Sequence, residues 1–292
     1  PSNLGGNGST ARPGVWCSTS VTTPVNCNTR SKAEWRYPVP SIDFNAITGD
    51  LCNLKKTAFR SEASTNALAS SPTACTNVTA GRTTAYIPRV ATAFNARRGY
   101  LIELNNNTTY NLYSVSNETY SYTNNSTYTS SYTTALTRTL VASNIAIPTN
   151  GVIFVEDNVW IRSNPTFNGR VTIASGRLAS ASEQTSVVIA DDLKYAQKDG
   201  TDAIGIIAEQ DVLIAPYAPP RPGDAVANYP FEVNGALIAK DGQVAFPADY
   251  ITRDTPDWSG NSSKKLVYYG SIAPRQSWTW LWTSGGTTTA SF

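Results

Sequence analysis

The chain has 292 residues, a formal net charge of +2, only 15% charged residues and no histidine. Without histidine there is no histidine base, triad or metal ligand, and no dinucleotide or P-loop fingerprint is present. We therefore expect a protein that is not an enzyme and has no cofactor or metal. No apolar run is long enough to span a bilayer, so we expect no membrane contact.

The first hundred residues are predicted to be an N-terminal region tied by disulfides. Its four cysteines lie in polar, loop-like sequence at Cys17, Cys27, Cys52 and Cys75. Two disulfides in an exported protein fit this usage, and among three possible connectivities we predict Cys17–Cys27 and Cys52–Cys75. The alternative is a zinc site, which is disfavoured because neither pair has C-x-x-C spacing.

A helix is predicted near residues 43–63. Its apolar residues recur at a spacing near 3.6, at Ile47, Leu51, Leu54 and Ala58. Three cations lie on or near one face of this helix: Lys55, Lys56 and Arg60. They form either an ordinary solvated face or a patch that contacts phosphates.

Two strands and a hairpin are predicted next. Residues 86–89 and 100–104 have strand composition, and the basic segment 95–99 connects them. Residues 105–134 consist almost entirely of Asn, Thr, Ser and Tyr, with Glu118 as the only charge. We predict that this segment forms a long β-hairpin that projects from the body.

The segment 150–272 contains a recurring unit, which is a β-prone run, a polar corner and usually a second β-prone run. The copies are 153–161, 188–195, 206–214 and 237–244, with a weaker copy at 171–178. Short runs that each have an unburied apolar face are typical of stacked coils. We therefore predict an all-β protein with one or two short helices, in which residues 101–292 form an irregular parallel β-helix or β-solenoid. An antiparallel sandwich of hairpins is the alternative.

Insertions are expected at 215–230 and 247–263, followed by a last strand at 265–272. The tail carries Trp278, Trp280 and Trp282, which share one face if the tail is extended. These rings either pack on a neighbouring rung or form a stacking platform for bases or sugars. The acidic corner pairs Glu156–Asp157 and Asp191–Asp192 are either solvated or hold calcium.

Charge is distributed unequally along the chain. Residues 1–150 contain 12 Lys or Arg and 6 Asp or Glu, which gives +6, whereas residues 151–292 contain 11 and 15, which gives −4. An asymmetry of this kind can mark where a polyanion binds.

The chain resembles a family of large pilus-associated proteins of the Deinococcus–Thermus type, related to PilX-like minor pilins, including competence-associated ones. The resemblance runs from about residue 39 to 275 through an ordered series of motifs at 39–44, 99–104, 147–155, 168–174 and 235–239. It implies a β-solenoid, a type IV pilus or pseudopilus location outside the cell, and DNA capture in natural transformation. The family's hydrophobic N-terminal helix is missing, so we expect a mature product or an excised domain whose anchor or secretion signal lies upstream.

These observations together predict a module that binds duplex DNA without sequence preference and contacts other pilin subunits. The predicted phosphate contacts are Lys55, Lys56, Arg60, Arg89, Arg97 and Arg98. One alternative is a pilus-tip adhesin or structural subunit that binds glycans, surfaces or other pilins. Another is a carbohydrate-active β-helix enzyme that works with carboxylates and Arg or Lys.

Overall fold

The architecture comes from a computed structural model of the chain. It describes the backbone of residues 42–60, 75, 82–90, 93–124, 130–179, 182–215, 217–218, 231–245, 266–276 and 278–279. Side chains are described for these residues except 60, 120–135, 266, 278 and 279. The predicted Cys17–Cys27 disulfide, the tryptophan side chains of the tail and most of the two predicted insertions lie outside the described residues.

The described residues are mainly β, with one helix, as the sequence predicts. The helix is α1 (Ala46–Arg60). A six-stranded sheet contains, in spatial order, β1 (Tyr86–Ile87), β5 (Val152–Val155), β7 (Arg170–Ser175), β9 (Ala203–Ala208), β11 (Phe231–Ala239) and β13 (Leu266–Pro274). An eight-stranded sheet contains β14 (Trp278–Thr279), β12 (Val244–Ala245), β10 (Val212–Ile214), β8 (Val187–Ile189), β6 (Asn158–Asn164), β2 (Gly99–Asn105), β3 (Thr109–Asn124) and β4 (Ser130–Ala146).

From β5 onwards, consecutive strands fall alternately into the two sheets, and each strand pairs in parallel with the equivalent strand of the next repeat. Three predicted copies become strand pairs joined by corners, namely β5 and β6 for 153–161, β9 and β10 for 206–214, and β11 and β12 for 237–244. The copies 171–178 and 188–195 each contribute one named strand, β7 and β8, and these two strands together form the repeat between the others. Parallel pairing throughout this region excludes the antiparallel sandwich of hairpins.

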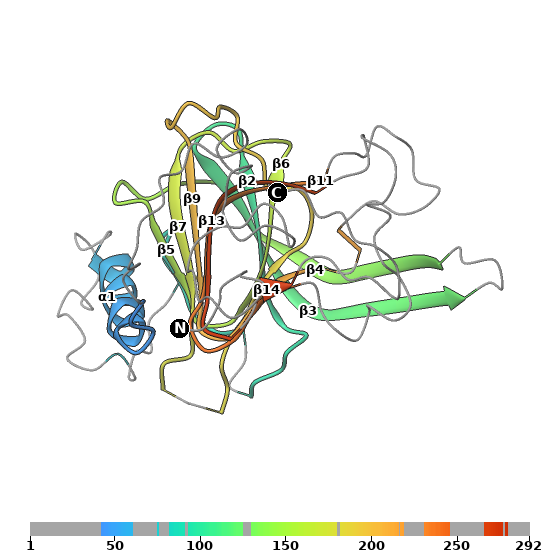
Figure 1. Cartoon of the computed structure of the whole chain (residues 1–292), viewed down its shortest axis with the longest axis horizontal. Helices are drawn as coiled ribbons and strands as arrows, with labels where there is room; N and C mark the ends of the chain where they lie inside the picture. Colours follow the sequence, from blue (N-terminus) through green and yellow to red (C-terminus); the bar gives the residue numbers. More distant parts are fainter. Residues whose placement is uncertain are drawn as a thin grey trace, which may run out of the picture. The chain divides into compact units, whose positions relative to one another are not determined.

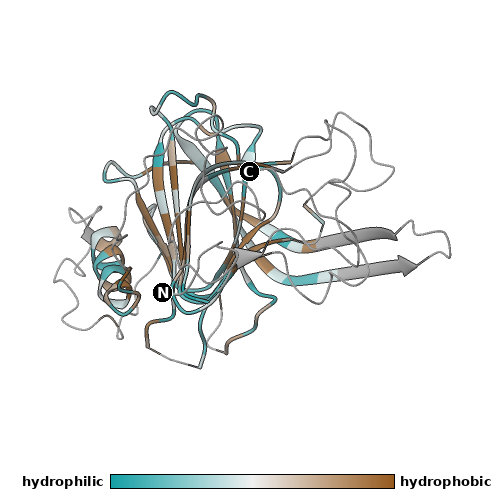
Figure 2. Cartoon of the chain, viewed as in Figure 1, coloured by the Kyte–Doolittle hydropathy of each residue, from teal (hydrophilic) through white to brown (hydrophobic). Residues whose placement is uncertain are grey.

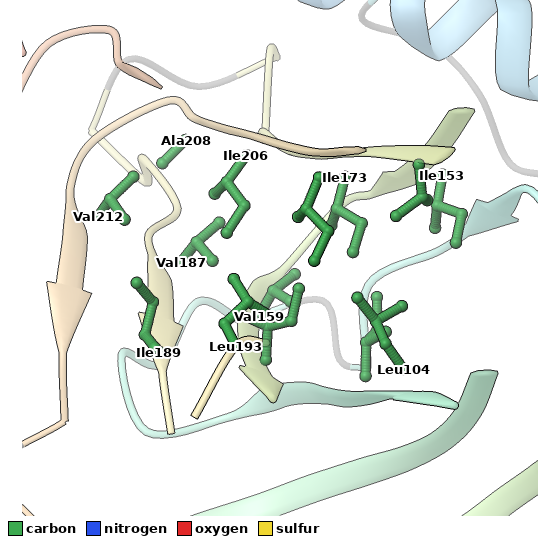
Figure 3. Close-up of a cluster of buried hydrophobic side chains, with 14 of the residues drawn as sticks. Leu104, Ile153, Val159, Ile173, Val187, Ile189, Leu193, Ile206, Ala208 and Val212 are labelled. Atoms are coloured by element: carbon green, nitrogen blue, oxygen red, sulfur yellow. The ribbon is translucent and has the colours of Figure 1, made fainter. Parts of the chain in front are cut away.

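The core lies between the two sheets and is built from β-branched residues in register. Ile153 pairs with Ile173, and Ile173 pairs with Ile206, so one column of isoleucines crosses the six-stranded sheet. Val159, Val187 and Val212 form the facing column (Figure 3). All six side chains are at most 1% exposed, and each contributes about 1.5–3 kcal/mol by leaving water. Figure 2 shows hydrophobic residues alternating with more polar ones along these strands.

Helix α1 lies beside the six-stranded sheet, next to β5 (Figure 1). Its predicted apolar face is confirmed, because Ile47, Leu51 and Ala58 are buried in a cluster with Tyr86 and Phe154. The ring of Phe59 stacks on that of Tyr86 at a centroid distance of 4.1 Å. The predicted Cys52–Cys75 disulfide is also present, with a Cα–Cα distance of 5.5 Å.

The predicted hairpin is confirmed as β3 and β4, which pair with each other in antiparallel fashion and extend away from the sheets (Figure 1). The return strand runs to Ala146, beyond the predicted end at 134, because it pairs with the first half of β3 as well as with its second half. Glu118 fixes the base of the hairpin. Its Oε1 accepts hydrogen bonds from Trp160 Nε1 and from the Tyr217 hydroxyl, both at 3.0 Å.

A second polar contact ties the hairpin to the sheet through Glu103 on β2, whose carboxylate is buried. It forms an ion pair with Arg162, whose Nε lies 2.8 Å from Oε2, and it accepts hydrogen bonds from Asn111 at 3.1 Å and Asn164 at 3.2 Å. Burial alone would raise the pKa of Glu103, but the hydrogen bonds and the charge of Arg162 outweigh it and hold this pKa below its ordinary value.

Replacement of Glu103 by Gln is expected to destabilise the fold in a pH-dependent way. A lowered carboxyl pKa stabilises the folded state above the unfolded-state pKa, and this contribution is lost as the pH falls through the folded-state pKa. Glu103→Gln should therefore reduce the free energy of unfolding by about 2 kcal/mol near pH 7 and by clearly less near pH 3. Urea unfolding at both pH values measures this, with the exposed Asp50→Asn as control. The prediction would be contradicted if the wild type and Glu103→Gln differed in free energy of unfolding as much near pH 3 as near pH 7.

Gly99, at the start of β2, is expected to tolerate no side chain. Its φ is +151°, and an added Cβ would lie 2.0 Å from the backbone oxygen of Asn158 on the paired strand. Gly99→Ala should lower the free energy of unfolding by about 2–4 kcal/mol, since a backbone atom of a central strand must shift. Gly49→Ala is the matched control, because nothing lies within 4 Å of its added Cβ on α1. This control should stabilise the protein by about 0.5–1 kcal/mol, and similar losses in both variants would refute the steric argument.

Candidate nucleic-acid interface

The corner between β5 and β6 holds two basic segments of the first half of the chain. Asp157 Oδ2 accepts a hydrogen bond from the backbone N–H of Val90 at 2.9 Å. Asn158 Nδ2 donates to the backbone oxygens of Asn95 at 3.2 Å and Arg98 at 3.1 Å. The segments that carry three of the predicted arginines, Arg89, Arg97 and Arg98, are thereby attached by their backbone to one corner.

We call Arg89, Arg97 and Arg98 the arginine corner. Arg89 and Arg97 are exposed and Arg98 is half-buried. A turn presents the last two, because Asn95 accepts hydrogen bonds from the backbone N–H groups of Arg97 and Arg98 at 2.9 and 3.0 Å. In the described part of the chain, no carboxylate lies within ion-pair distance of these three guanidinium groups. The charge of Arg89 acts on Asp157 from beyond ion-pair distance.

The two carboxylates of this corner are engaged by internal partners. Glu156 forms an ion pair with Lys55 and accepts a hydrogen bond from the Tyr86 hydroxyl at 2.7 Å. Asp157 lies 3.8 Å from a guanidinium nitrogen of Arg177 and accepts backbone hydrogen bonds from Val90 and Asn158. Burial raises the pKa of Asp157 despite these partners, and burial next to Glu156 raises the pKa of Tyr86. The calcium alternative for this acidic pair is disfavoured, since its oxygens already serve protein donors.

Lys55 does not belong to the interface, and its predicted role is corrected. The side chain is only 2% exposed, and its Nζ donates to the backbone oxygen of Cys75 at 2.9 Å in addition to its ion pair with Glu156. The ammonium also lies 5.9 Å from the centroid of the Phe154 ring. A group enclosed in this way cannot reach a phosphate. Lys56 is half-buried on the same helix, and the side chain of Arg60 lies outside the described residues.

Sequence reasoning missed Arg177, which is the central cation of the corner. Its buried guanidinium pairs with Glu183 at 2.9 Å as well as with Asp157, and it lies 5.2 Å from the centroid of the Phe94 ring. A signal was present, because Arg177 follows the Ser-Gly corner of the weaker repeat 171–178. In stacked repeats that position lies beside the acidic corner of the preceding repeat.

Further charged residues line the later corners, but they pair with one another. Asp241 forms ion pairs with Lys240 and, at 2.8 Å, with Arg275, and it accepts a hydrogen bond from Gln184. Burial would raise the pKa of Asp241, yet these cations hold it below its ordinary value. Burial raises the pKa of the neighbouring Glu209. Within the described residues, no group of three or more His, Cys, Asp or Glu side chains could hold a metal ion.

Comparison of the chain with protein-family models, with curated proteins and with solved structures found no match. Among the described helical residues, no helix is long and apolar enough to cross a membrane. Function is therefore inferred from the residues and their geometry.

The Lys55–Glu156 pair generates a prediction about stability. Lys55→Met leaves a buried carboxylate without its cation and should lower the free energy of unfolding by about 3–5 kcal/mol. The neighbouring control is Lys56→Met, whose side chain is half-buried and forms no ion pair with any described residue. It should change the free energy of unfolding by less than about 0.5 kcal/mol. Urea unfolding measures both.

Combining Lys55→Met with Glu156→Gln should recover part of the loss, since the charge that Lys55 neutralises is then absent. Strictly additive losses in the double variant would show that the two groups are not coupled, contrary to the structure.

Proposed function

We propose that this protein is an exported surface module that binds duplex DNA without sequence preference through the arginine corner. The observation that carries the proposal is the convergence of Arg89, Arg97 and Arg98 on one corner whose carboxylates are engaged by other cations. Guanidinium groups match phosphate oxygens in bidentate geometry. Contacts to phosphates fix a protein on DNA and carry no sequence information, as uptake of any incoming DNA requires.

We also propose that the parallel parts of the two sheets are two faces of one β-solenoid belonging to a type IV pilus-associated minor pilin. Strands that alternate between sheets and columns of identical residues in register support the solenoid. The family resemblance supports the pilus location and other pilin subunits as partners. The Cys52–Cys75 disulfide supports an extracellular, oxidising environment.

An adhesin or structural pilus subunit is the second candidate, and the projecting hairpin favours it. Leu140 is 52% exposed and Val141 is 38% exposed on β4, the outermost strand of its sheet. Apolar side chains on a projecting edge strand suit contact with a surface, a glycan or another subunit. This candidate places the contact on the hairpin and not on the arginine corner.

DNA binding by the arginine corner is tested by its dependence on salt. Three phosphate contacts predict a log–log salt slope of about −2.7 and a loss of about fortyfold in affinity between 50 and 200 mM salt. Arg97→Ala with Arg98→Ala should bring the slope about two units closer to zero and weaken binding to unrelated duplexes alike. Fluorescence anisotropy with two duplexes of different sequence measures this.

The charge-matched control is Arg138→Ala with Arg170→Ala. Both arginines are exposed and lie away from the corner, on β4 and β7. The control should retain at least two thirds of the wild-type slope. Undetectable binding at low salt, or equal losses in the two double variants, would reject the arginine corner and favour the adhesin.

A further inference from the structure

A lysine, a glutamate and an asparagine meet on the outer side of β11. Glu232 and Asn234 are two residues apart on this strand, so they share one face, while Val233 between them is buried in the core. The segment after β8 runs along the same stretch. Leu193 donates its backbone N–H to Glu232 at 2.9 Å and accepts one from Asn234 at 2.7 Å. This pairing brings the loop that carries Lys198 to Glu232.

One carboxylate oxygen serves both other side chains. Glu232 Oε1 lies 2.7 Å from Lys198 Nζ and 2.6 Å from Asn234 Nδ2, so the two nitrogen atoms are at most 5.3 Å apart, the sum of these distances. A group that transfers protons must lie about 2.6–3.2 Å from the atoms it serves, and Glu232 meets this condition for an amine and a carboxamide together.

Asn234 is fully buried, and no donor among the described residues reaches its Oδ1. A buried carbonyl without a donor is uncommon and requires an explanation, of which a reactive role is one. The carboxamide is thus held at Nδ2 alone. Its Nδ2 shares the Glu232 carboxylate with the amine of Lys198.

We propose that Lys198 and Asn234 form an intramolecular amide crosslink, with Glu232 as the proton-transfer group. Glu232 takes a proton from the ammonium of Lys198, and the amine formed in this way attacks Cγ of Asn234. Glu232 returns this proton to Nδ2, and one further proton of Nζ is released to water. The Nζ–Cγ bond forms, the Cγ–Nδ2 bond breaks, and ammonia leaves, while Oδ1 remains the carbonyl oxygen. The reaction consumes no oxidant, reductant or other reactant.

The surroundings suit this reaction. Because the fold holds the amine and the carboxamide at one carboxylate, the step is effectively unimolecular. Glu232 is 14% exposed and Lys198 is 43% exposed in their side chains, so water is partly excluded at the carboxylate while ammonia has a route out. The product would covalently join the loop before β9 to β11, which is the neighbouring strand of the same sheet.

The mass of the intact full-length chain tests the proposal after reduction and alkylation of its cysteines. The wild type should weigh about 17 Da less than its sequence, the mass of ammonia, and a digest should contain one linked peptide with Lys198 and Asn234. Lys198→Arg keeps the ion pair with Glu232 but should restore the full mass. Asn234→Asp should lose about 18 Da, because water then leaves in place of ammonia.

Glu232→Gln should also have the full mass, and its circular dichroism shows whether it folds. If Glu232→Gln does not fold, the mass of Lys198→Arg tests the proposal instead. This variant should fold, because the side chain at position 198 is partly exposed and keeps its charge. Lys194→Arg is the matched control and should still weigh about 17 Da less than its sequence, because Lys194 pairs with Asp192 and not with Glu232. A wild-type chain of full sequence mass, or one heavier by about 1 Da from deamidation at Asn234–Gly235, would overturn the proposal.

Discussion

In-register hydrogen bonding between parallel strands is the constraint on which the rest of the structure depends. It places residues from the same position of successive repeats beside one another, so that isoleucines stack on isoleucines between the sheets. The same register brings the corners together, and therefore Asp157 of one repeat meets Arg177 of the next. The packing of the core and the ion pair at the corner therefore both follow from the register of the parallel strands.

This alignment also decides which charges remain accessible. Glu156 and Asp157 are satisfied by Lys55 and Arg177, two buried cations that come from the helix and from the next repeat. Unpaired, these carboxylates would repel a phosphate. Because they are neutralised from within, the arginines attached to the same corner present an excess of positive charge to solvent.

The sequence predicts local features well because they depend on spacing. Alternating β-branched residues around polar corners identify β5 to β12, and the 3.6-residue spacing identifies α1. The burial of Lys55 was missed although it lies four residues after Leu51 and three before Ala58, hence on the buried face. Its partner Glu156 is 101 residues away, and local patterns do not reveal such pairs. The same holds for Arg97 and Arg98, whose position depends on Asn158.

One feature of the eight-stranded sheet limits how copies of the chain can associate. Stacked parallel strands leave open edges, and open edges template the addition of further strands and the growth of fibres. On β2 that edge is closed, because β3 turns back and pairs with it in the opposite direction while β6 occupies its other side. The hairpin thus takes the place of a further parallel repeat on β2, and the strand at this edge of the sheet is β4, which runs antiparallel to β3.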